Sequence, residues 1–79
     1  MKSAMKALEL IEEGQWDAAH TLVQDNNDKI SCLIHAYLHR EEGDDSNASY
    51  WYMCANESFP QNSLIDELAR LRRLIGDDI

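Results

Sequence analysis

The sequence contains few residues that interrupt helices, with one proline and three glycines in 79 residues. All four lie between, or at the ends of, segments whose apolar residues recur at helical spacing. Proline removes a backbone donor from a helix interior and glycine destabilises one, so their absence from the segment interiors favours helix. Because no stretch is left for a β-sheet, the sequence predicts an all-α fold.

Basic residues are also scarce, at 7 lysines and arginines against 15 aspartates and glutamates, which gives a formal net charge of −8. An electrostatic field of this sign repels the phosphates of nucleic acids and anionic lipid headgroups. We therefore expect neither nucleic acid nor a membrane as a partner.

A long uninterrupted apolar run is missing as well. Lys6, Glu9 and Glu12 break the apolar pattern of the N-terminal segment, so we expect no secretory signal peptide, no membrane span and a cytoplasmic location. Thiols stay reduced in the cytoplasm. Cys32 and Cys54 could in principle pair, but we expect both to be small buried apolar side chains.

Apolar residues recur three and four positions apart in five segments, which is the pattern of amphipathic helices. The third segment is apolar almost all round, so we expect it at the centre of the fold. The expected helices cover about residues 3–13, 15–24, 29–42, 45–58 and 63–76. We interpret residues 1–79 as a single domain with a first hairpin (1–27), a second hairpin (28–60) and a closing helix (61–76).

The two hairpins repeat one another. A shift of 29 residues aligns Glu12-Glu13-Gly14 with Glu41-Glu42-Gly43, and Ala19 with Ala48. Small residues at fixed offsets from a glycine turn allow two antiparallel helices to approach closely. The second unit resembles a tetratricopeptide or Sel1-like repeat through Ala36, Gly43, Asp44, Ala48, Tyr52, Ala55 and Pro60, although the offset is shorter than the ~34 residues of that family.

A second resemblance comes from the order of the motifs HAYLHR, EGD, NA and YWY between His35 and Tyr52. This order is similar to that of a small family of bacterial proteins. The resemblance implies a bacterial cytoplasmic protein and supplies no activity. Repeats of the tetratricopeptide type usually present a surface to a partner, so that resemblance implies a protein-interaction or scaffold module.

Most of the aromatic and histidine side chains lie in the second hairpin, where they could form a crevice for a ring, a peptide or a partner's side chain. Serines and cysteines carry no recognisable nucleophile motif around them, so we expect a non-catalytic protein without a cofactor. We expect a protein or peptide partner, and self-association is an open alternative. The candidate binding surface consists of His35, Tyr37, His39, Arg40, Trp51 and Tyr52.

The alternative is a small-molecule or metal-binding protein, possibly enzymatic, that uses His35, His39, Trp51 and Tyr52. The two histidines are one helical turn apart and could chelate an ion together. Cys32 shares their face but lies about 10 Å along the helix from His39, too far to share an ion. Further ligands would have to come from elsewhere, such as His20 or an acid. Because no CxxC or HExxH motif supplies them, we expect packed, hydrogen-bonded histidines and no metal.

Overall fold

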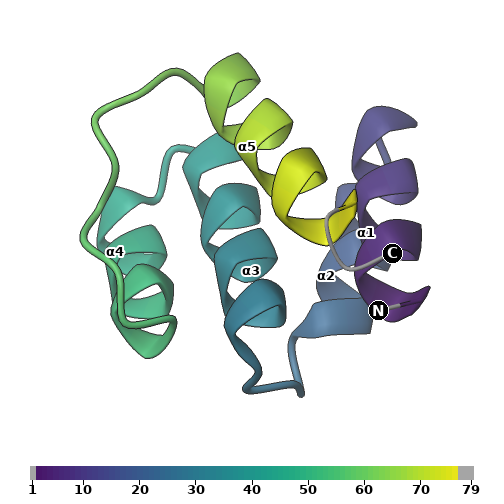
Figure 1. The fold of residues 1–79 in the computed structure, drawn as a ribbon, viewed down its shortest axis with the longest axis horizontal. Helices are drawn as coiled ribbons and strands as arrows, with labels where there is room; N and C mark the ends of the chain where they lie inside the picture. The colour runs from purple at the N-terminus through teal and green to yellow at the C-terminus, as the bar shows by residue number, and fades with distance from the viewer. Residues whose placement is uncertain (1, 77–79) are drawn as a thin grey trace.

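The computed structural model describes residues 2–76, and five helices lie in this range. They are α1 (Lys2–Glu12), α2 (Trp16–Val23), α3 (Lys29–Glu41), α4 (Asp45–Cys54) and α5 (Leu64–Gly76). Helices α1 and α2 form one antiparallel hairpin, α3 and α4 form the second, and α5 closes the fold (Figure 1). No strand occurs within the described residues, so the all-α prediction is confirmed.

Helix α3 lies at the centre. It packs against each of the other four helices, and Figure 1 shows it between α4 on one side and α1 and α2 on the other. Every side chain from Ser31 to His39 is buried, which agrees with the apolar character of this segment on all sides. The histidines of α3 therefore lie in the interior of the fold.

The turns of both hairpins follow from local sequence. Gly14 has φ = 76° and Gly43 has φ = 83°, the left-handed conformation that glycine adopts without a steric penalty. Asp28 caps α3 by accepting a hydrogen bond from the Ser31 amide at 3.0 Å. Asp44 caps α4 in the same way through the Asn47 amide at 3.3 Å.

Helix α4 is shorter than expected, since it ends at Cys54 instead of continuing to residue 58. Asn56 takes a left-handed conformation with φ = 61°, and the Glu57 amide donates to the Tyr52 carbonyl at 2.9 Å. This turn stops the helix without a glycine. The prediction that both cysteines are buried is wrong for Cys54, the last residue of α4, which is exposed, whereas Cys32 is buried.

A buried carboxylate holds α5 in place. The Glu67 side chain is fully buried and accepts hydrogen bonds from the Tyr52 hydroxyl at 2.7 Å, Asn62 Nδ2 at 3.0 Å and Arg70 Nε at 2.9 Å. Burial alone would raise the pKa of Glu67, but the hydrogen bonds from Arg70, Asn62 and Tyr52 outweigh it and lower the pKa to about 2. This network ties α5 to α4 and to the loop between them.

None of the helices between residues 2 and 76 is both long enough and apolar enough to cross a bilayer.

Candidate metal centre

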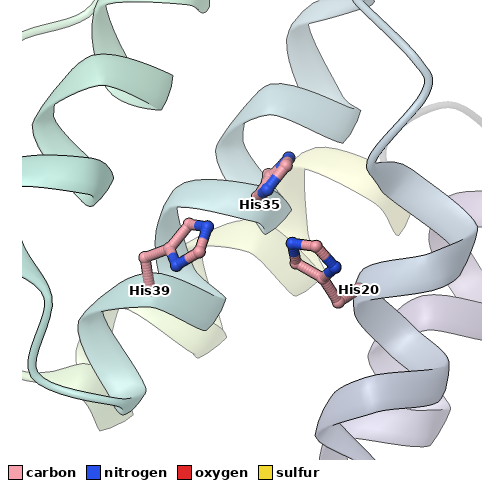
Figure 2. A group of neighbouring side chains, drawn as sticks. All are labelled: His20, His35 and His39. Atoms are coloured by element: carbon pink, nitrogen blue, oxygen red, sulfur yellow. The ribbon is translucent and has the colours of Figure 1, made fainter.

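Three imidazole rings meet at the contact between α2 and α3. His20 comes from α2, and His35 and His39 come from successive turns of α3. The ring centroids of His20 and His35 are 4.5 Å apart, those of His35 and His39 are 4.9 Å apart, and those of His20 and His39 are 5.5 Å apart. Figure 2 shows the three rings around a shared space. One nitrogen of each ring lies within 4.8 Å of the others.

Trp16 places His20 in this group. Its indole Nε1 donates a hydrogen bond of 2.7 Å to the carbonyl of Leu38 and so fixes the start of α2 against α3. His20 lies one helical turn after Trp16, and the two rings stack with centroids 4.8 Å apart and an interplanar angle of 10°. The spacing of Trp16 and His20 on α2 thus repeats the spacing of His35 and His39 on α3.

His35 is the most enclosed of the three histidines, with 4% of its surface exposed. Its ring stacks on Trp51 of α4 with centroids 3.8 Å apart. Among the described residues its buried Nδ1 has no hydrogen-bond partner. Burial, helped by the nearby His20 and His39, lowers the pKa of His35 to about 4. The ring is therefore uncharged at neutral pH, which is the form that binds metals.

His20 and His39 surround the same space in different ways. His20 is half-buried, and burial, followed by the charge of His39, lowers its pKa, against the opposing effect of Glu42 and Asp17. His39 is 7% exposed, and its Nδ1 lies 2.6 Å from Oε1 of Glu42. The contact with Glu42 leaves Nε2 as the ring nitrogen of His39 that can bind an ion.

The three histidines fit the donor set of a transition-metal site. A tetrahedral Zn²⁺ with Zn–N bonds of about 2.0–2.1 Å places two ligand nitrogens about 3.3 Å apart. Because the three nitrogens already lie within 4.8 Å of one another, each pair needs to close by about 1.5 Å or less. Cys32 is not a member of this group of ligand atoms, and its thiol donates to the carbonyl of Asn27 at 3.6 Å.

A second group of possible ligands shares His39. One nitrogen of His39 and carboxylate oxygens of Glu42 and Asp44 also lie within 4.8 Å of one another. Both acids are exposed, and Asp44 is engaged as the cap of α4. Exposed acids at a helix turn are common without an ion, so this group has weaker support than the three buried rings.

Three of the six predicted site residues belong to the histidine cluster, and the other three do not. His35, His39 and Trp51 lie together in the histidine cluster. Tyr37 and Tyr52 are buried, at 4% and 0% exposed, and so present no surface to a partner. Arg40 is half-buried and donates to Asn62, through Nη1 to Oδ1 at 2.9 Å and through Nη2 to the carbonyl at 2.6 Å, where it orders the loop before α5.

Sequence reasoning named His20 only as one possible further ligand and did not include Trp16 or Glu42. The available signals were the Trp16–His20 spacing on α2 and a glutamate three residues after His39. Neither signal shows by itself that α2 packs its histidine against α3.

Comparison of the chain with protein-family models, with curated proteins and with solved structures found no match. The resemblances to tetratricopeptide or Sel1-like repeats and to a small bacterial family therefore stay predictions.

Proposed function

We propose that the protein binds a late first-row transition-metal ion, with Zn²⁺ as the best fit, through His20, His35 and His39. The observation that carries this proposal is the buried Nδ1 of His35, which has no hydrogen-bond partner among the described residues. Leaving such an atom unpaired costs about 1–3 kcal/mol, and native proteins contain few of them. A metal ion among the three rings would give this nitrogen a partner.

The ligand chemistry favours this class of ion. Imidazole nitrogen suits Zn²⁺, Cu²⁺ and Ni²⁺, whereas Mg²⁺ and Ca²⁺ prefer oxygen ligands. Burial lowers the pKa of both His20 and His35, that of His35 to about 4, which favours the unprotonated form of imidazole that binds metals. The net charge of −8 also attracts cations to the protein.

The proposed role is binding and not catalysis. Three histidines leave one position of a tetrahedral ion open to water or to another ligand. His20 is the half-buried member of the group, whereas His35 and His39 are buried.

Cobalt(II) spectroscopy tests the proposal. Zinc-free protein titrated with Co²⁺ should develop visible absorption bands of a nitrogen-ligated ion that saturate at one equivalent and disappear when Zn²⁺ is added. His20→Ala, His35→Ala and His39→Ala should each abolish the bands. Cys54→Ser is the control, because Cys54 is the exposed thiol and an adventitious site would depend on it. Bands that survive all three histidine substitutions would refute the site.

A protein-interaction role is the second candidate function. Tyr50 and Met53 are 58% and 74% exposed and lie one turn apart on α4, so both project from the same side of the helix. Large exposed side chains of this kind serve as binding anchors. Light scattering over a wide concentration range would reveal self-association through this face, and a Tyr50→Ala, Met53→Ala double variant should then stay monomeric.

A further inference from the structure

We infer that Glu42 is the positioning residue of the three-histidine site, where it fixes the proton of His39 on Nδ1 and leaves Nε2 free for the ion. This inference rests on the proposed metal-binding function. It assigns a role to an exposed acid that does not itself touch the ion.

The contact between the two side chains is short and partly enclosed. His39 Nδ1 and Glu42 Oε1 are 2.6 Å apart, with 9% of the His39 side chain and 43% of the Glu42 side chain exposed. An ionised carboxylate only accepts hydrogen bonds. The facing nitrogen must therefore carry the proton, and in a neutral imidazole the other nitrogen then has a free lone pair.

The backbone holds Glu42 in place. Its amide donates to the Leu38 carbonyl at 3.3 Å, and the Asp44 amide donates to the His39 carbonyl at 2.9 Å across the left-handed Gly43. This hydrogen-bonded turn closes the end of α3. The turn that ends α3 therefore fixes the backbone of Glu42 relative to His39, independently of any bound ion.

The opposite side of the His39 ring faces the cluster. Its neighbours there are His35 and His20, together with Trp16, whose ring meets it edge-on at 5.9 Å. Figure 2 shows one nitrogen of His39 directed toward the space that the other two rings share. A carboxylate behind a ligating histidine orients the ring and strengthens its donor nitrogen, and loss of such a partner lowers metal affinity by about 10–100-fold.

Nitrogen NMR of the zinc-free protein tests this inference separately from metal binding. With ¹⁵N-labelled histidine, a long-range ¹H–¹⁵N spectrum near pH 7.5 should show His39 with the proton on Nδ1. In Glu42→Ala this preference should be lost. A wild-type ring with its proton on Nε2, or an unchanged His39 signature in Glu42→Ala, would overturn the inference.

Zinc affinity supplies the second readout. Glu42→Ala should weaken zinc binding by about 10–100-fold, and Glu42→Gln, whose amide oxygen can still accept from Nδ1 of His39, should weaken it less. Asp45→Asn is the matched control, because it removes the same charge from an exposed position just past this turn, and its affinity should change less than twofold. Equal affinity in wild type and Glu42→Ala would overturn the role of Glu42. Absence of zinc binding in wild type would refute the proposed function, while the NMR result would still decide the role of Glu42.

Discussion

Replacement of Tyr52 by phenylalanine should destabilise the fold and leave metal binding intact. The Tyr52 hydroxyl is buried and donates to Glu67 Oε2 at 2.7 Å, and a hydrogen bond to a charged group contributes about 1.5–3 kcal/mol. For a domain of this size, 1 kcal/mol shifts the melting temperature by roughly 4–8 °C. The expected decrease is therefore about 6–24 °C at neutral pH.

The pH dependence of this effect follows from Glu67. Its pKa is lowered from 4.5 to about 2 in the folded protein, so the unfolded chain binds the proton first as the pH falls. The ionised network contributes about 3 kcal/mol that is fully present above pH 4.5 and is lost as the pH falls toward 2. The difference between wild type and Tyr52→Phe should shrink over the same interval, because the acceptor loses its charge.

Urea denaturation followed by circular dichroism measures both effects. Tyr50→Phe is the matched control, since Tyr50 is 58% exposed and loss of its hydroxyl should change stability by less than about 0.5 kcal/mol. Equal stability of Tyr52→Phe and wild type at neutral pH would refute the account of how α5 is held. A loss of zinc binding in a folded Tyr52→Phe protein would show that Tyr52 belongs to the site.

Three further predictions follow from burial. Ala48→Leu should destabilise the protein by about 1–3 kcal/mol, because Ala48 is fully buried, and an unchanged melting temperature would refute the close approach of α3 and α4. In zinc-free protein, the His35 pKa of about 4 should reduce stability by about 2 kcal/mol between pH 7.5 and 5, because the unfolded chain takes up a proton near pH 6.5 that the folded chain does not. His35→Phe should reduce this slope in urea titrations, and an unchanged slope would refute burial of His35. Iodoacetamide should label Cys54 rapidly and Cys32 only after unfolding, and equal labelling rates in native protein would contradict the placement of Cys32.

The helices and their hairpin arrangement could be predicted because local signals agree with one another. Apolar spacing predicted the helix positions, and the left-handed Gly14 and Gly43 lie at the turns that the repeat indicated. The end of α4 could not be predicted, because Asn56 makes the left-handed turn and asparagine signals such a turn less strongly than glycine.

Buried polar residues were harder to predict than the helices. From the sequence, a charged residue such as Glu67 is expected at the surface. Its burial depends on partners elsewhere in the chain, which are Tyr52 on α4, Asn62 in the loop before α5 and Arg70 one turn further along α5. The candidate site shows the same limit. The shared face of His35 and His39 follows from helical spacing, but the approach of His20 depends on how α2 packs against α3, which the hydrogen bond from Trp16 to Leu38 fixes.

Calorimetric titration of the zinc-free wild-type protein with Zn²⁺ at neutral pH tests the central claim most directly. We expect one equivalent of Zn²⁺ to bind with sub-micromolar affinity, and His20→Ala to lose this binding, because its imidazole is the ligand that α2 brings to the two histidines of α3. A wild-type protein that binds no zinc, or a His20→Ala variant that binds it equally well, would contradict the three-histidine site.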